Sequence, residues 1–208
     1  FWGMSKVLDN RQALVAAVLG EEECPFAETP VQLQVWLPAR VFDGVLFVEN
    51  QMSFEKLIRS GRPQQGLAIV YAAGFKAGAQ RLRAPGGASL FYSAAGDLSE
   101  AGRALFERWL FRQAEPGEKS AFFWGDLDFS GMWILAALRS TFSTLVAWQP
   151  GYRPMLESLQ AGGGHPPLAA DKAGQRPLER TGCPFADSEL LPALKLAGRF
   201  LDQETFAV

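Results

Sequence analysis

The feature that most constrains the fold is an alternation, over residues 31 to 148, of short apolar runs with amphipathic helical patterns. Such an alternation is typical of βαβ units built around a mostly parallel sheet. It predicts strands at 45–48, 67–71, 89–92, 121–124 and 145–148, and helices through 54–58, from Gly74 to Leu82, over 98–111 and from a Ser130 cap through Leu138. The fold class is therefore α/β, with a mostly parallel sheet flanked by helices.

The chain is long enough for one sizeable core, with 208 residues of which 48% are hydrophobic. We assign residues 41–208 to the main domain and residues 1–40 to an N-terminal extension or the remnant of an upstream domain. Residues 149–185 are rich in Pro and Gly, so we expect a long loop there. Helical character resumes at Asp187 and predicts a C-terminal helical segment.

The composition narrows the classes of function. A net charge of −2 with 20% charged residues gives no wholly basic surface, so any DNA binding must come from local patches. The apolar runs are shorter than the ~20 residues that span a bilayer, and the start of the chain lacks a secretory signal. We therefore expect a cytoplasmic protein with no membrane contact. Cys24 and Cys183 lie in no CxxC pair, which argues against a zinc site.

Acidic side chains follow two of the predicted strands at the point where each strand ends. Glu49 follows Val45–Val48, and Asp126 and Asp128 follow the strand that ends at Trp124. Ligands of open parallel sheets bind at the carboxyl ends of strands, and alternation puts Asp126 and Asp128 on one side of the chain. Carboxylate oxygens suit a hard cation such as Mg²⁺ or Mn²⁺. The alternative is a solvated Glu and a helix-capping Asp-x-Asp.

The order of these acids resembles the Toprim domain of topoisomerases, primases and related nucleases: a strand ending in Glu, two further strands, then a strand ending in Asp-x-Asp. Three segments look more specifically like the C-terminal Toprim domain of the Wadjet plasmid-defence nuclease family JetD, which is similar to the A subunit of type IIB topoisomerases. They are Val-Glu-Asn-Gln-Met-Ser-Phe (48–54), Gly-Asp-Leu-Asp-Phe-Ser-Gly (125–131) and Gly-Arg-Phe-Leu-Asp-Gln-Glu (198–204). The resemblance runs from about Val45 to the C-terminus.

The resemblance implies a Toprim, Rossmann-like domain that hydrolyses DNA phosphodiester bonds with Mg²⁺ or Mn²⁺. Glu49, Asp126 and Asp128 would be the catalytic, metal-holding carboxylates. Glu204 would be a fourth metal ligand, or else an exposed acid on a terminal helix. The implied partners are DNA and a defence complex of an ATPase like those of structural maintenance of chromosomes (SMC) and a kleisin. Homodimer formation and the number of metal ions stay open.

Positive charge is concentrated in residues 55–83, which hold six Lys and Arg residues against a single acid, Glu55. We predict that four of them bind DNA phosphates on the rim of the site, namely Lys56, Arg59, Lys76 and Arg81. An ordinary solvated face is the alternative. His165 and Lys172 would contact phosphate only if their loop folded over the site.

Three other functions are open from the sequence alone. A non-cleaving Toprim-like module would bind DNA or a partner protein with the same acids. A topoisomerase-like subunit would need a nucleophilic tyrosine, whereas Tyr71, Tyr92 and Tyr152 look like packing residues. A phosphatase or nucleotide-binding domain would carry Asp-x-Asp after its first strand, and here it follows the fourth.

Overall fold

The computed structural model describes residues 12–21, 30–60, 66–72, 79–84, 86–111, 119–170 and 172–206. The chain divides into two compact units, residues 1–30 and residues 31–208. Helix α1 (Gln12–Leu19) belongs to the first unit. We placed the start of the main domain at residue 41, but strand β1 (Val31–Trp36) pairs with two strands of the main sheet. The compact unit that holds the sheet therefore begins at Val31.

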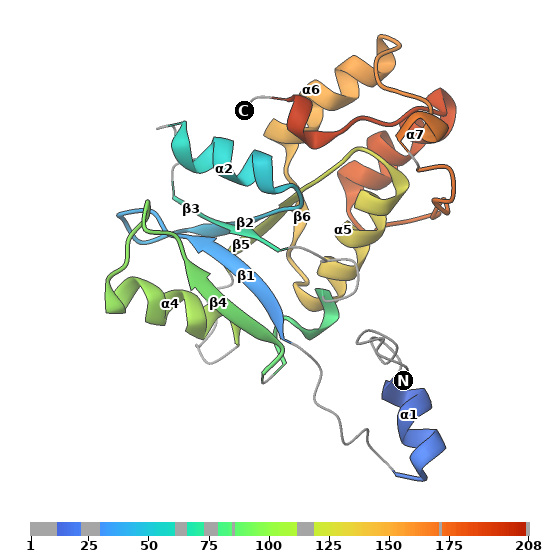
Figure 1. Ribbon diagram of the computed structural model, residues 1–208. Coiled ribbons are helices and arrows are strands. Elements are labelled where there is room, and N and C mark those ends of the chain that lie inside the picture. The colour runs from blue at the N-terminus through green and yellow to red at the C-terminus, as the bar shows by residue number, and fades with distance from the viewer. Residues whose placement is uncertain are drawn as a thin grey trace. The chain divides into compact units, whose positions relative to one another are not determined.

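A six-stranded sheet organises the second unit, in the order β4-β1-β3-β2-β5-β6. Its other strands are β2 (Gly44–Val48), β3 (Leu67–Tyr71), β4 (Ala88–Tyr92), β5 (Ser120–Trp124) and β6 (Val146–Ala147). β3, β2, β5 and β6 run parallel to one another, whereas β1 is antiparallel to β3 and parallel to β4. The prediction of an α/β fold with a mostly parallel sheet is confirmed (Figure 1).

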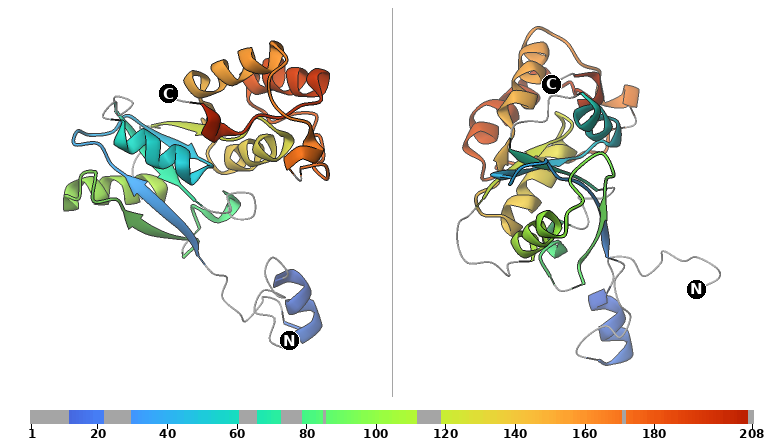
Figure 2. Two further views of the ribbon diagram at one scale, coloured as in Figure 1. Left: turned by 45° about the horizontal axis from the view of Figure 1, so that its top comes forward. Right: turned by 90° about the vertical axis from the view of Figure 1, so that its left-hand side faces the viewer.

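Helices cover both faces of this sheet (Figures 1 and 2). The longer ones are α2 (Gln51–Arg59), α4 (Glu100–Leu110), α5 (Phe129–Thr141), α6 (Gln149–Gln160) and α7 (Leu191–Ala197). Short helical turns are η1 (Ala79–Arg81), η2 (Pro167–Ala170), η3 (Ala186–Leu190, a π-helical turn) and η4 (Gln203–Thr205). α2 and α6 lie on one face, and α4 and η1 lie on the other. No helix in the described part of the chain is long and apolar enough to cross a membrane.

The central strand β2 is apolar because helices cover it on both faces. All five of its residues are buried. The Phe47 ring packs toward α4 and the end of α5, where Trp109 and Phe142 lie 6.3 Å and 5.0 Å from it between ring centroids. A parallel strand buried on both faces is expected to be a continuous apolar run. The sequence therefore identified β2, β3 and β5 at nearly their observed positions.

Residues 149–160 contradict the predicted long loop, because they form α6. Pro150 and Pro154 suggested irregular structure, but Pro150 lies in the first turn, where the missing N–H costs nothing. Tyr152, Met155 and Leu159 recur at helical spacing and are buried. Burial of this apolar face stabilises the helix by more than the loss of the backbone hydrogen bond that Pro154 cannot donate. The irregular segment begins at residue 161.

The start of α5 also differs from the prediction, because Asp128 rather than Ser130 caps it. The Gly131 N–H donates to Asp128 Oδ1 at 2.8 Å. Ser130 instead lies in the first turn, where its N–H donates to Gln175 Oε1 at 2.9 Å. Most of the helix expected from Gly74 to Leu82 lies outside the described residues. The part that the structure describes contains the short turn η1.

Candidate active site

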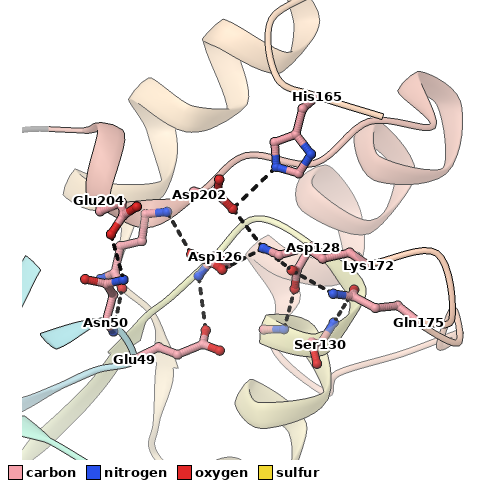
Figure 3. Close-up of polar contacts among 12 residues, drawn as sticks. Glu49, Asn50, Asp126, Asp128, Ser130, His165, Lys172, Gln175, Asp202 and Glu204 are labelled. Carbon is pink, nitrogen blue, oxygen red and sulfur yellow. Dashed lines mark hydrogen bonds and ion pairs between the residues drawn. The ribbon is translucent and has the colours of Figure 1, made fainter. Parts of the chain in front are cut away.

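Two neighbouring parallel strands bring the predicted acids to one edge of the sheet. Val48 of β2 lies opposite Trp124 of β5, so the chain leaves both strands at the same edge. Glu49 N–H donates to Trp124 O at 3.0 Å. Asp126 N–H donates to Glu49 Oε2 at 3.1 Å (Figure 3). The prediction that these strands are neighbours is confirmed, and the Glu49 carboxylate lies against the backbone that carries Asp126.

Two glycines permit this close approach. A Cβ on Gly125 would lie 2.3 Å from Glu49 Oε2, and a Cβ on Gly131 would lie 2.3 Å from Asp126 O. Both separations are far below van der Waals contact. The motif 125–131 therefore needs glycine at both ends so that Glu49 and the start of α5 can reach the Asp126 backbone.

Asp128 is almost fully buried, with 2% of its side chain exposed. Its Oδ1 caps α5, while its Oδ2 accepts a hydrogen bond from Gln175 Nε2 at 2.9 Å. The cap satisfies one of the backbone N–H groups that have no partner within the first turn of a helix. Asp128 thus links the start of α5 to Gln175 in the irregular segment.

Asp126 is held by the C-terminal segment. Its Oδ1 accepts a hydrogen bond from Gln203 N–H at 2.8 Å. The buried Gln203 side chain donates to Trp124 O at 3.1 Å and accepts from Asn50 N–H at 3.0 Å. Leu127 and Leu201 also form an antiparallel bridge. Backbone and amide groups at the ends of β2 and β5 are therefore clamped by residues 201–203.

A lysine ammonium lies among three carboxylates at this edge (Figure 3). Lys172 Nζ is 2.8 Å from Asp126 Oδ2, 2.8 Å from Asp128 Oδ2 and 2.8 Å from Asp202 Oδ1. His165 Nε2 is 3.4 Å from the same Asp202 oxygen. The loop does fold over the site, so Lys172 and His165 lie within the acidic cluster.

The carboxylates differ in how readily they ionise. Burial raises the pKa of Glu49 to about 8, and the charges of Asp126 and Asp128 add to the rise. Burial also raises the pKa of Asp126, although hydrogen bonds from Gln203 N–H and Lys172 oppose the change. Burial acts in the same direction on Asp202, but the hydrogen bonds and positive charges of Lys172 and His165 together outweigh it and lower that pKa. With a pKa of about 8, Glu49 keeps its proton for most of the time at neutral pH in the metal-free chain.

Lys172 stays charged in this setting. Burial disfavours its ammonium form, but hydrogen bonds to Asp126, Asp128 and Asp202 outweigh that effect and hold the lysine pKa above its ordinary value. One ammonium faces three aspartates, so the cluster keeps an excess of negative charge. Such a site attracts further positive charge.

A comparison with known protein families identifies the family of this chain. The family described as Wadjet protein JetD, C-terminal, matches residues 9–149, which is more than half of the 208-residue chain. The chain belongs to this family. A search of curated proteins found no match.

Membership of the JetD family makes the chain part of a Wadjet defence subunit. The matched residues include Glu49, Asp126 and Asp128. They also begin well before Val45, where we placed the start of the resemblance, and end before the segment 198–204. Lys172 and Asp202 therefore come from a part of this JetD-family chain that the match does not cover.

The structure does not bring Glu204 to the same place as Asp126. Asn50 Nδ2 donates to Glu204 Oε2 at 3.2 Å, and Lys56 Nζ donates to Glu204 O at 2.6 Å. Asp202, two residues earlier, is the acid of that segment that shares a cation with Asp126. The sequence pointed to Glu204 as the acid of this Asp-Gln-Glu segment, and its role as a metal ligand stays a prediction. The helical turn η4 points Asp202 and Glu204 to different neighbours.

The predicted DNA-binding residues are not all on one face of this JetD-family domain. Lys56 and Arg59 lie in the last turn of α2, where Arg59 Nη2 pairs with Glu55 Oε2 at 3.0 Å. Arg81 lies in η1, on the other face of the sheet (Figures 1 and 2). Lys76 lies outside the described residues. Because α2 and η1 lie on opposite faces of the sheet, closeness in sequence did not imply a shared surface.

The donor chemistry of the site fits a hard divalent cation. Asp126 and Asp128 already bind a cation, the Lys172 ammonium, through one oxygen each. Among the described residues, however, no three His, Cys, Asp or Glu side chains are placed to hold a metal ion in this arrangement. The residues fit the ion by charge and by donor type, while the position between the two aspartates is taken by Lys172.

Proposed function

We propose that this chain is the metal-dependent DNA-cleaving domain of a Wadjet complex. It would hydrolyse phosphodiester bonds of plasmid DNA in the cytoplasm, together with SMC-like ATPase and kleisin subunits. Glu49, Asp126 and Asp128 would hold Mg²⁺ or Mn²⁺. The arrangement of acids in a JetD-family chain, on a Rossmann-like sheet consistent with a Toprim domain, supports this function.

One observation carries the proposal: Glu49 and Asp126 leave neighbouring parallel strands at the same edge, and the Asp126 and Asp128 carboxylates share a cation there. A phosphodiester is an anion, and acids would repel it. Clustered carboxylates at a strand end therefore suit phosphate chemistry only when a cation lies between them and the substrate. When bound, a divalent ion neutralises phosphate charge and lowers the pKa of a coordinated water.

The residues of the chain would have separate tasks in hydrolysis. Asp128 is fixed by its helix cap and Asp126 by Gln203 N–H, so each presents its second oxygen, Oδ2, toward the site. Glu49, whose Oε2 accepts from Asp126 N–H, would either bind the ion as a carboxylate or, as a carboxylic acid, give its proton to the leaving oxygen. In hydrolysis a water oxygen bonds to phosphorus and releases its proton to solvent, while the bond from phosphorus to the leaving sugar oxygen breaks and that oxygen takes up a proton.

The tyrosines support hydrolysis by water over a tyrosyl intermediate. Tyr152 is fully buried, and its hydroxyl accepts a hydrogen bond from Gly125 N–H at 3.0 Å. Tyr92 donates to Glu107 Oε1 at 2.9 Å, and the Tyr71 ring packs on Phe54. Each is engaged in packing or structural hydrogen bonds, as the sequence suggested.

Cleavage of plasmid DNA by the assembled complex tests the proposal. Asp126→Asn is preferred to alanine because the amide keeps an oxygen for Gln203 N–H. Changing residues that merely orient metal ligands typically costs 10–100-fold, so loss of a ligand charge should reduce Mg²⁺- or Mn²⁺-dependent cleavage by at least about 100-fold. Glu100→Gln, an exposed change in α4, is the matched control. Cleavage by the Asp126 variant at the wild-type rate at saturating metal would remove Asp126 from the site.

A second function is favoured by the position of Lys172, which fills the site with an ammonium group. A domain that only binds DNA or a partner protein could keep that ion pair permanently. In that case Asp126→Asn would leave cleavage by the complex unchanged while changing DNA or subunit binding. The same plasmid experiment, read together with a binding measurement, separates the two functions.

A further inference from the structure

On both Asp126 and Asp128, a backbone N–H occupies one carboxylate oxygen, and the other oxygen faces a cation. Asp126 Oδ1 is bound by Gln203 N–H, and Asp128 Oδ1 is bound by Gly131 N–H. The two remaining oxygens, both Oδ2, are the atoms that lie 2.8 Å from Lys172 Nζ. A divalent ion bridging the two aspartates would bond to the same pair of atoms.

Lys172 and such an ion cannot occupy this place together. Mg²⁺ binds oxygen at about 2.0–2.1 Å, so an ion bonded to both Oδ2 atoms would compete with the ammonium, 2.8 Å from each, for the same oxygens and would repel its charge. The ammonium carries one positive charge into a cluster of three aspartates. A divalent ion would bring more charge, and the exchange would leave Lys172 displaced toward solvent.

The segment that carries Lys172 is tied down on both sides of it. We call residues 163–170 and 172–176 the strap. At one end His165 and Phe200 exchange backbone hydrogen bonds of 2.9 Å and 3.0 Å, and Arg199 Nε donates to Gly163 O at 3.0 Å. At the other end the Gln175 side chain bonds to Ser130 N–H and Asp128 Oδ2, and Trp133 Nε1 donates to Arg176 O at 2.8 Å.

Between these ties most of the described residues of the strap are exposed, Pro167 and Lys172 being partly buried. Leu168, Ala169, Ala170, Ala173 and Gly174 are all exposed, whereas 19% of the Lys172 side chain is exposed. Withdrawal of Lys172 would therefore break three ion pairs and little apolar packing. The backbone hydrogen bonds of Lys172, from its N–H to Pro167 O and to its O from Gln175 N–H, stay within the strap, so the lysine side chain can move while the ties of Gln175 to α5 remain.

We infer that the strap is a cation-bearing plug: Lys172 occupies the place of a divalent ion between Asp126 and Asp128, and the site becomes ready for metal when the strap lifts. This inference rests on the proposed function, since it concerns the ion that the same carboxylates would hold. It makes the resting domain self-inhibited. Any event that draws Lys172 away, such as a competing anion, would admit the metal.

Binding of Mn²⁺ alone to the full chain, followed by calorimetry or electron paramagnetic resonance, tests the plug without DNA. Lys172→Met removes the ammonium and keeps a long side chain, and Lys195→Met, an exposed change in α7, is the matched control. If the strap is closed for nine tenths of the time or more, Lys172→Met should bind Mn²⁺ at least about tenfold more tightly than wild type. Lys172→Met with Asp126→Asn should lose that gain.

The outcomes separate the plug from the proposed function. Equal Mn²⁺ affinity of wild type and Lys172→Met, lost in Asp126→Asn, would overturn the plug and leave the metal site standing. Weaker binding by Lys172→Met would mean that Lys172 organises the site rather than blocks it, which also overturns the plug. No Mn²⁺ binding by any of these proteins would overturn both proposals.

Hydrogen exchange of the wild-type chain gives a second measurement that does not depend on a variant folding. Saturating Mn²⁺ should speed exchange in peptides that cover residues 166–174, because the strap has lifted. Exchange in α5 should be unchanged or slower, because its cap at Asp128 stays in place. Slower exchange across the strap in Mn²⁺ would contradict displacement of Lys172.

Discussion

At the scale of single residues, Asp128 combines a structural and a chemical role through its two oxygens. Oδ1 caps α5 at Gly131 N–H, and Oδ2 faces Lys172 and Gln175. The two roles can be separated, because an asparagine retains an oxygen for the cap but loses the negative charge. An alanine loses both.

We expect Asp128→Ala to unfold more easily than Asp128→Asn. Loss of an N-cap costs roughly 1 kcal/mol of stability, with a range of about 0.5–2 kcal/mol. Both variants remove the same charge from the acidic cluster, so the difference between them isolates the cap. Denaturant unfolding of the two chains measures it. Both should bind Mn²⁺ poorly, and equal stability would show that the cap contributes nothing.

Glu49 predicts a pH dependence of stability in the metal-free chain. Its pKa rises from 4.5 to about 8 on folding, so the folded state binds this proton more tightly than the unfolded state. Below about pH 4.5 both states are protonated, and above it the unfolded state alone ionises. Stability therefore falls as pH rises through this window, and the loss is complete above about pH 8.

The measurement is thermal unfolding of wild type and Glu49→Gln from pH 4.5 to pH 8 without metal. Glutamine cannot ionise, so the variant should lose less stability across the window than wild type. Glu100→Gln, which changes an exposed acid, should follow the wild-type curve. Parallel curves for wild type and Glu49→Gln would show that Glu49 is not a buried, proton-retaining group.

At the scale of elements, the strands that carry the first acids could be predicted, but the segments that complete the site could not. β2 and β5 are apolar because they are buried on both faces, and a buried strand with an acid at its end is visible in sequence. α6 was hidden by Pro150 and Pro154. Lys172 and Asp202 reach the site only through the closure of an irregular segment, which follows no local pattern.

α6 also supports the site directly, through Tyr152. The buried Tyr152 hydroxyl accepts from Gly125 N–H, and the ring packs in the core. Tyr152→Phe would leave that N–H buried without its partner, which costs about 1–3 kcal/mol. We expect a matching loss in the free energy of unfolding, measured with denaturant.

The control for this prediction is Tyr71→Phe. Its ring packs on Phe54, and within the described segments its hydroxyl makes no hydrogen bond. Stability of that variant should stay close to wild type. A similar loss in both variants would mean that the Gly125 hydrogen bond is not the cause.

At the scale of the whole molecule, the two faces of the sheet should differ in their part in DNA binding. The net charge of −2 gives no general attraction to DNA, so single basic residues near the acidic edge matter. Lys56 is exposed, and its ammonium bonds to Glu204 O beside the end of β2, where Asn50 begins α2. Arg81 lies across the sheet in η1.

We therefore predict that Lys56→Gln weakens DNA binding and that Arg81→Gln does not. Each phosphate contact contributes about 0.9 to the slope of log K against log salt, so Lys56→Gln should flatten that slope by about one. Titration of duplex DNA at several salt concentrations, with the full chain in its complex, measures the slope. The two variants remove the same charge from the chain, so a change common to both would reflect net charge alone. A flatter slope only for Arg81→Gln would place DNA on the α4 face, away from the carboxylates. Cleavage at the acidic edge requires the duplex to reach those carboxylates, so this result would contradict the prediction.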